Sequence, residues 1–376
     1  MDVVIAAGGA PWEAAAIGEI AASSTLRLAR RCVDVADLLA VAQTDLASAA
    51  LVNTELAGLD ADTVFRLERA GVRVAAVESD EHRCVGLGIG RRVSLGSLDV
   101  VARELATNPL ENVASEAGQV VAVWGPAGAP GRSTVALGLA AAAAARGIDT
   151  VLVDADTYGG SLAQMLAVLD DVSGLMAACR AANNGRVAEV TNHLLAIDPH
   201  LRLLTGLPRA DMWPQIRSGA LDLVLRQLRT STELVVVDCG FSLEPGNGSV
   251  SRNQSTLQVI EHSDTVVAVG RADPVGLARL VRGLQELRES SPGQAPVVVV
   301  NMMRASIGWP EREVDTTLRR LTGIAPTTFL PFDQSALDVG LMSGRTARSA
   351  APGSPLVARI EVLAATLVPR GVAAAS

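Results

Sequence analysis

The sequence contains no lysine, since all 32 of its basic residues are arginine. Any mechanism that needs a lysine side chain is therefore excluded. The chain of 376 residues is long enough for two or three domains. Hydrophobic residues make up 49% of it and charged residues 19%, which is typical of a globular protein and excludes an intrinsically disordered one.

Cysteine and histidine are scarce, with four of each, and they are scattered along the chain. No cysteines have C-x-x-C spacing, so we expect neither a disulfide framework nor a structural zinc site, and a reducing cytoplasm is the natural compartment. No signal peptide is visible, and the longest apolar run, Val135–Ala145, is far shorter than the roughly 20 residues of a membrane span. We expect a soluble, cytoplasmic protein without a transmembrane segment.

The polar segment Thr107–Gly118 separates two regions in which strand-like and helix-like patterns alternate. We predict a first domain at residues 1–107, a linker at 108–118 and a second domain at 119–376. In the first domain the expected strands are Val3–Ala7, Leu26–Leu28, Ala49–Val52, Arg73–Val77 and Val85–Ile89. The expected helices are Pro11–Ala22, Asp34–Gln43, Asp60–Ala70 and Ser97–Ala106. This alternation predicts a small parallel sheet covered on both faces.

The second domain has the same alternation with stronger strands. They are expected at Gln119–Trp124, Thr150–Asp154, Leu201–Thr205, Leu234–Cys239, Thr265–Gly270, Val297–Asn301 and Thr327–Leu330. Runs such as Val297–Val300 indicate strands buried on both faces, and Asp273–Ser290 is an expected intervening helix. The pattern predicts a doubly wound α/β domain with a mostly parallel sheet, whose ligands bind at the carboxyl ends of the strands.

The segment Gly125–Thr134 is the most informative one. It follows a predicted strand, contains three glycines and ends in an arginine and two hydroxyl residues, directly before a helix of small apolar residues. Glycines let backbone N–H groups converge on an anion, a helix N-terminus favours negative charge, and a hydroxyl can coordinate Mg²⁺. The segment therefore predicts a phosphate-binding loop; the alternative is a glycine-rich turn without a ligand.

This loop resembles the deviant Walker A motif of the MinD/ParA ATPases, Lys-Gly-Gly-x-Gly-Lys-Thr/Ser. Further segments resemble that family's later motifs in the same order: Val151–Ser161, Leu234–Gly240, Val297–Arg304, Leu330–Asp333, and then Gly340 and Gly344. The resemblance spans most of residues 119–368 and implies a P-loop NTPase fold. The loop and the second motif are most similar to an actinobacterial subgroup described as CpaE-like or septum-site-determining (Ssd) proteins. CpaE and TadZ relatives carry a receiver-like domain ahead of the ATPase.

The resemblance implies ATP or ADP and Mg²⁺ as cofactors and assigns roles to particular residues. The phosphates would be bound at Gly128, Gly131, Arg132, Ser133 and Thr134. Ser133 and Asp238 would hold Mg²⁺, Asp154 would orient the attacking water, and Asn301 would recognise adenine. Taken singly, each acidic residue could equally be the cap of a helix that follows a strand.

Two departures from the family motif concern its lysines. The first lysine, which in active dimers reaches the partner's nucleotide, falls at Ala127, and the second, which holds the β- and γ-phosphates, falls at Arg132. Arginine keeps the positive charge, but its planar fork is bulkier than an ammonium. The loss at Ala127 removes a group expected to neutralise transition-state charge, so whether ATP is hydrolysed stays open.

The first domain departs from an active receiver. Its first strand ends in Gly8 and Gly9, and Asn53 follows the third strand, where a receiver has its phosphate-accepting aspartate. A receiver also needs a late lysine. We therefore interpret residues 1–107 as a pseudo-receiver used for dimerisation or docking; a flavodoxin-like domain with an unrelated role is the alternative.

Three functions remain open. The first is a nucleotide-dependent, dimerising switch that positions a septum or a Tad-type pilus or secretion machine, with the proteins of those machines as partners. The second is a pseudo-ATPase scaffold, and the third is a ParA-like DNA-partitioning ATPase. The net charge of −8 gives no strong nucleic-acid signal. The tail Pro355–Pro369 has few basic residues and is expected to be a helix that covers the sheet, so contact with a septum or pole would be peripheral, through partners.

Overall fold

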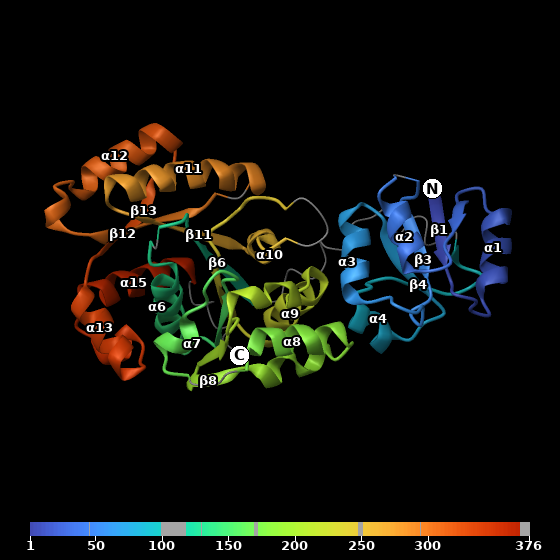
Figure 1. The fold of residues 1–376 in the computed structure, drawn as a ribbon, viewed down its shortest axis with the longest axis horizontal. Helices are drawn as coiled ribbons and strands as arrows, with labels where there is room; N and C mark the ends of the chain where they lie inside the picture. Colours follow the sequence, from blue (N-terminus) through green and yellow to red (C-terminus); the bar gives the residue numbers. More distant parts are fainter. Residues whose placement is uncertain are drawn as a thin grey trace, which may run out of the picture. The chain divides into compact units, whose positions relative to one another are not determined.

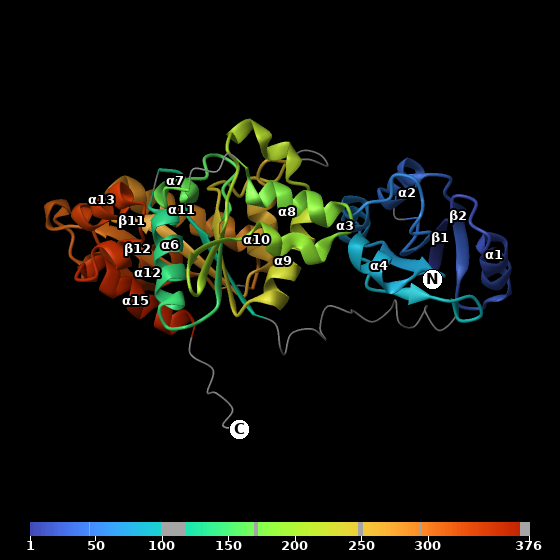
Figure 2. The ribbon, with the colours of Figure 1, turned by 90° about the horizontal axis from the view of Figure 1, so that it is seen from below.

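The computed structural model describes residues 1–44, 46–98, 118–128, 130–168, 172–246, 251–293 and 295–368. The predicted linker, apart from Gly118, and most of the expected helix Ser97–Ala106 lie outside these residues. The chain forms two compact units, one around a five-stranded sheet and one around an eight-stranded sheet (Figures 1 and 2).

The first sheet is parallel, with strand order β2-β1-β3-β4-β5. Its strands are β1 Asp2–Ala6, β2 Arg27–Arg31, β3 Ala49–Val52, β4 Arg73–Val77 and β5 Arg92–Val93. The helices are α1 Glu13–Ala22, α2 Val35–Ala42, α3 Ala61–Arg69 and α4 Glu81–Leu87. This order is the flavodoxin-like one, and alternate residues of β1, such as Val4 and Ile5, enter separate cores on the two faces. The expected α/β fold of this unit is confirmed.

One expected strand is wrong. Residues 85–87 of the expected strand Val85–Ile89 belong to helix α4. Asp80 caps this helix, because its side chain accepts a hydrogen bond from the backbone N–H of Arg83, and Gly88 ends it in a left-handed conformation. The two caps favour a helix, and the short apolar run is compatible with it, because such a run fits a buried helix face as well as a strand.

The second sheet has strand order β13-β12-β11-β6-β10-β7-β9-β8 and is parallel except for β8. Its strands are β6 Gln119–Trp124, β7 Thr150–Ala155, β8 Leu195–Asp198, β9 Leu201–Leu204, β10 Leu234–Cys239, β11 Thr265–Arg271, β12 Val297–Met303 and β13 Pro326–Pro331. All seven strands expected in this half are confirmed. The sequence does not predict β8, an edge strand of four residues.

Ten α-helices and three short 3₁₀ helices accompany this sheet in the described part of the chain. The α-helices are α6 Arg132–Ala144, α7 Leu162–Met165, α8 Gly174–Asn183, α9 Ser218–Ser231, α10 Gln254–His262, α11 Pro274–Ser290, α12 Glu311–Thr322, α13 Gln334–Ser343, α14 Ala347–Ala350 and α15 Pro355–Leu367. The 3₁₀ helices are Val187–His193, Ala210–Gln215 and Ala305–Ile307.

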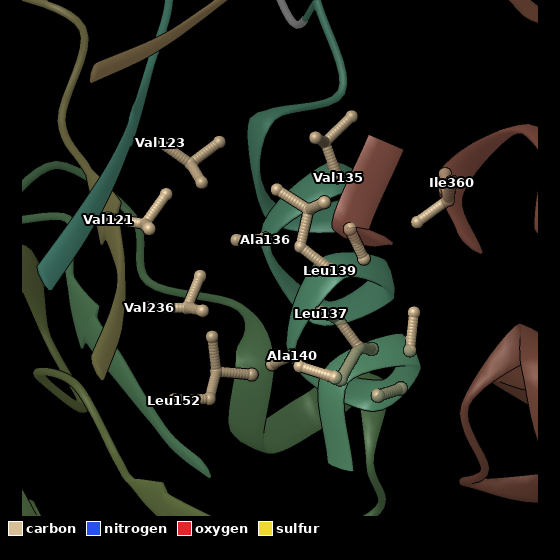
Figure 3. Close-up of a cluster of buried hydrophobic side chains, with 14 of the residues drawn as sticks. Val121, Val123, Val135, Ala136, Leu137, Leu139, Ala140, Leu152, Val236 and Ile360 are labelled. Atoms are coloured by element: carbon tan, nitrogen blue, oxygen red, sulfur yellow. The ribbon is translucent and has the colours of Figure 1, made fainter. Parts of the chain in front are cut away.

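Helix α6 packs against the centre of the sheet through small side chains. Figure 3 shows the strand residues Val121, Val123, Leu152 and Val236 facing Val135, Ala136, Leu139 and Ala140 of this helix, with Ile360 of α15 beyond it. A Cβ at Gly138 would lie 2.8 Å from the side chain of Ile360, so α6 and α15 approach closely. On the opposite face, Trp124 packs under Gly283 of α11. Helices therefore cover both faces, and α15 covers the sheet as expected.

Candidate phosphate-binding site

The predicted loop joins β6, a central strand, to the N-terminus of α6. Gly131 is the N-cap of α6 and has φ +88°, a left-handed conformation that favours glycine. A Cβ at Gly131 would come within 2.4 Å of the side-chain nitrogen of Asn301, so the loop passes very close to the end of β12. This geometry explains why the sequence has a glycine directly before the helix.

The start of α6 is suited to an anion. Its N-cap, Gly131, has no side chain to cap the first N–H groups, and its first turn contains no acidic residue. Free N–H groups at a helix N-terminus carry partial positive charge and attract phosphate. Ser133 and Thr134, both half-buried, present hydroxyl groups in the same turn. Thr134 also lines a mainly apolar hollow of about 120 Å³ whose other walls include Leu337 and Gly340 of α13.

Arg132 lies across the loop and is paired with Asp156. One guanidinium nitrogen donates to the carbonyl oxygen of Gly125 at 3.2 Å, and another donates to a carboxylate oxygen of Asp156 at 3.2 Å. The side chains are 13% and 8% exposed, so this ion pair is well shielded from water. No role for Asp156 is predicted from the sequence, although it is the second acid of the Asp154-x-Asp156 pattern.

Asp238 and Asp154 stand next to each other at the carboxyl ends of β10 and β7, where the two residues pair in register. Asp238 is fully buried, and neither of its carboxylate oxygens has a hydrogen-bond partner among the described residues. Burial raises its pKa well above the usual value, and the charge of Asp154 raises it further, whereas the Ser133 hydroxyl and the Arg132 guanidinium act in the opposite direction.

Asp154 organises the segment that follows β7. Its carboxylate accepts hydrogen bonds from the backbone N–H groups of Leu162, at 3.1 Å, and Asp156, at 3.3 Å. A Cβ at Gly160 or at Gly206 would lie 2.7 Å from this carboxyl group, so both glycines leave room for it. Burial, and to a lesser extent the charge of Asp156, raises the pKa of Asp154 to about 6, although backbone N–H groups, those of Leu162 and Asp156 among them, lower it.

These oxygen groups suit Mg²⁺. Hydroxyl and carboxylate oxygens are hard ligands, and Mg²⁺ usually takes one or two protein oxygens together with waters and substrate phosphates. The unpartnered carboxylate of Asp238, with Ser133 beside it, supplies such a partial set. No cluster of three or more His, Cys, Asp or Glu side chains that could enclose a metal occurs in the described ranges, so a complete protein cage is not formed there.

The side chain of Asn301, which is expected to recognise adenine, forms hydrogen bonds with backbone groups of the protein. Its side-chain nitrogen donates to the carbonyl oxygen of Pro130 at 2.8 Å, and its side-chain oxygen accepts from the backbone N–H of Met302. Asn301 is 5% exposed. The side chain therefore fastens the phosphate loop to the end of β12, and the role in adenine recognition stays a prediction.

In the first unit, Asn53 follows β3, at the position where an active receiver carries its acceptor aspartate. Its side-chain nitrogen donates to the carbonyl oxygen of Ala7 at 3.0 Å, and its oxygen accepts from the backbone N–H of Glu55 at 3.1 Å. The amide therefore ties together the loops after β1 and β3. The pseudo-receiver interpretation stays a prediction.

The chain matches no protein-family model and no curated protein sequence at a significant level. Solved structures, in contrast, match it over about two thirds of its length. A ParA family ATPase from Chlorobium tepidum is 20% identical, with 65% of this chain and 98% of that chain covered and a TM-score of 0.56. The cell division ATPase MinD of Pyrococcus furiosus is 18% identical, with 66% and 98% covered and a TM-score of 0.55.

The second unit has the fold of the MinD and ParA ATPases. The septum site-determining protein MinD of Pyrococcus horikoshii, solved in complex with Mg-ADP, is 17% identical over 67% of this chain and 96% of that chain, with a TM-score of 0.54. The MinD/ParA fold confirms the expected P-loop domain. None of the helices in the described part of the chain has the length and apolar character that crossing a bilayer requires.

Proposed function

We propose that this protein is an ATP-binding spatial regulator of the MinD/ParA type, a nucleotide-dependent switch that dimerises and positions a septum or a Tad-type pilus or secretion machine. The observation that carries the proposal is the buried, unpartnered carboxylate of Asp238 beside Ser133 at the start of α6. A buried charge without a partner is costly, and such groups concentrate where a ligand or ion completes the site. The solved MinD complex with Mg-ADP supports this interpretation.

In this proposal the N-terminus of α6 binds the phosphates of ATP or ADP. The backbone around Gly128 and Gly131 and the side chains of Arg132 and Thr134 contact them, and Ser133 and Asp238 hold Mg²⁺, with Asp238 acting through water. Bound Mg²⁺ would neutralise phosphate charge. The hollow between Thr134 and α13 is placed to receive part of the nucleoside.

Asp154 is the proposed orienting group for the attacking water. Its pKa of about 6 lies close to neutral pH, where a carboxylate can accept a proton and release it again. The backbone donors of Leu162 and Asp156 hold its carboxyl group in one orientation. A pKa displaced upward by burial is the usual preparation of an acid–base residue.

A pseudo-ATPase scaffold is the second candidate, and the contacts of Arg132 favour it. Arg132 is already neutralised by Asp156, and Ala127 contributes no charge. Phosphates must compete with Asp156 for the guanidinium, which weakens binding and slows turnover. The homodimer, the CpaE-like or Ssd subgroup and the division, pilus or secretion partners belong to the first proposal; DNA partitioning has no specific support.

The test is equilibrium binding of a fluorescent ATP analogue with Mg²⁺ to wild type, to Arg132→Ala and to Arg202→Ala, with sedimentation velocity in the presence and absence of ATP. Arg202 is a matched control, because it is also partly buried and paired with a carboxylate, that of Asp149. We expect micromolar binding and dimerisation by ATP in wild type and the control, with both lost in Arg132→Ala. Binding without dimerisation favours the scaffold, and no saturable binding to folded wild type rejects both nucleotide-based proposals.

A further inference from the structure

Arg279 of α11 lies against the phosphate loop at the position where the family motif has its first lysine. Its guanidinium donates from Nη1 to the carbonyl oxygen of Ala127 at 3.3 Å. The next residue, Gly128, has φ +114°, and a Cβ there would come within 2.1 Å of the same nitrogen. The guanidinium therefore rests directly on the loop backbone, at a place that glycine keeps open.

Three arginines contact this loop, and two of them are paired with carboxylates. Arg132 pairs with Asp156 at 3.2 Å. Arg271, which donates to the carbonyl oxygen of Gly128 at 3.4 Å, pairs with Asp273 at 2.9 Å. Within the described ranges Arg279 has no carboxylate partner, and it is exposed to solvent. It therefore contributes a positive charge that no ion pair of the described residues neutralises.

The surroundings of Arg279 favour an anion. Arg271 and Arg279 line a hollow of about 210 Å³ together with Ala127 and Gly128 of the loop and with Asp273, whose carboxylate pairs with Arg271. A guanidinium has five N–H donors in a planar fork that matches the oxygens of a phosphate. One donor is used on Ala127, so others remain for a ligand at the mouth of the loop.

We propose that Arg279 binds the terminal phosphate of the nucleotide and supplies the positive charge that the chain lacks at Ala127. The inference rests on the proposed function, because it needs a nucleotide at the loop. The ligand chemistry is the same whether the phosphate is held by the same chain or by a second copy. Arg279 thereby makes the site selective for a nucleoside triphosphate over a diphosphate.

The test compares binding of ADP and of the non-hydrolysable ATP analogue AMPPNP, each with Mg²⁺, by calorimetry. The variants are Arg279→Ala, Arg279→Lys and the control Arg282→Ala. Arg282 lies three residues further along α11, is exposed like Arg279 and lines a neighbouring hollow to which Arg279 and Ala127 also contribute. Unlike Arg279, it donates no hydrogen bond to a loop carbonyl in the described part of the chain. Melting temperatures establish that each variant is folded.

Arg279→Ala loses a charge-assisted contact. Its affinity for AMPPNP should therefore be about 10-fold lower than that of wild type, and its affinity for ADP less than about 2-fold lower. Arg279→Lys should recover part of the loss, and Arg282→Ala should change neither affinity. An equal loss for both nucleotides, or no loss for either, would overturn the inference. If wild type binds neither nucleotide, the proposed function itself fails, which is a different result.

A mixing experiment distinguishes the two sources of the phosphate. Arg279→Ala retains its loop, whereas Arg132→Ala retains Arg279 but lacks the loop arginine. Tight AMPPNP binding that returns when the two variants are mixed shows that Arg279 reaches the phosphate held by a second copy. Because Arg132→Ala alone is expected not to dimerise, sedimentation velocity first establishes that the mixture contains dimers. In such a mixture, binding that stays weak, with ADP affinity unchanged, places Arg279 on the phosphate of its own chain.

Discussion

Asp238 pairs in register with Asp154 across the parallel strands β10 and β7, so two buried carboxyl groups stand side by side at one edge of the sheet. Neither oxygen of Asp238 has a hydrogen-bond partner in the described part of the chain, and burial and Asp154 both raise its pKa. This arrangement is unfavourable for the protein alone and favourable for binding a cation. Removing the Asp238 carboxyl group should therefore raise the stability of the ligand-free protein and weaken the binding of Mg²⁺ and nucleotide.

Asp238→Asn should separate these two effects. Without Mg²⁺ and nucleotide, the free energy of unfolding should rise by about 1–3 kcal/mol, because a buried acid whose oxygens have no hydrogen-bond partner among the described residues is replaced by a neutral amide. Mg²⁺-dependent binding of ATP should fall at least about 10-fold. Urea unfolding and calorimetry measure the two quantities. Asp315→Asn is the control, because Asp315 of α12 lies away from the loop and its side chain is 29% exposed and paired with Arg319. A destabilised Asp238→Asn with unchanged binding would contradict the assignment.

Asp154 should make the ligand-free protein less stable as pH rises. Its pKa is raised from 3.8 to about 6, so the folded state holds the proton more tightly than the unfolded state. The stabilising contribution is complete below about pH 4 and is lost as pH rises through about 6, and it amounts to about 3 kcal/mol. Between about pH 4 and pH 6, the free energy of unfolding of wild type should therefore fall by about 3 kcal/mol more than that of Asp154→Asn. Parallel pH profiles for the two proteins would show that Asp154 keeps an ordinary pKa.

Gly131→Ala should damage the loop for two reasons. The left-handed backbone at φ +88° disfavours a side chain, and the new Cβ would meet the side-chain nitrogen of Asn301 at 2.4 Å. We expect a loss of about 2 kcal/mol or more in stability and a loss of nucleotide binding. Gly159→Ala is the matched control, because nothing lies within 4 Å of its added Cβ. Thermal denaturation measures the melting temperatures of both variants. Equal melting temperatures would contradict the described loop geometry.

Asn301→Ala tests whether this side chain positions the loop or reads the base. Its loss leaves the carbonyl oxygen of Pro130 without its partner, which should lower stability by about 1–2 kcal/mol. Because the loop itself loosens, binding of ATP, GTP and inorganic triphosphate should weaken by the same factor. Competition against a fluorescent ATP analogue measures all three. A variant that loses the preference for ATP over GTP and binds triphosphate normally would identify Asn301 as a base reader instead.

The parts of the fold and site that depend on local patterns could be predicted. Continuous valine runs predicted the buried strands, and the glycines before Arg132 predicted the strand–loop–helix unit. Asp154 and Asp238 lie side by side because the carboxyl ends of parallel strands meet at one edge of the sheet.

The remaining features depend on contacts between residues far apart in the sequence. Arg279 reaches a loop residue 152 positions away, and Asp156 meets Arg132 across the edge of the sheet. No spacing in the sequence indicates either contact. The strand predicted at Val85–Ile89 is wrong for a different reason, because a capped helix and a strand can bury the same residues.

We propose that the start of α6, with Ser133 and Asp238, forms a nucleotide site that requires Mg²⁺. Calorimetric titration of the full chain with ATP, in the presence of Mg²⁺ and again with a chelator, is the decisive test. We expect one site per chain, micromolar affinity with Mg²⁺ and a loss of affinity of at least about 10-fold with the chelator. Folded protein that binds no ATP, or binds it equally well without Mg²⁺, would contradict it.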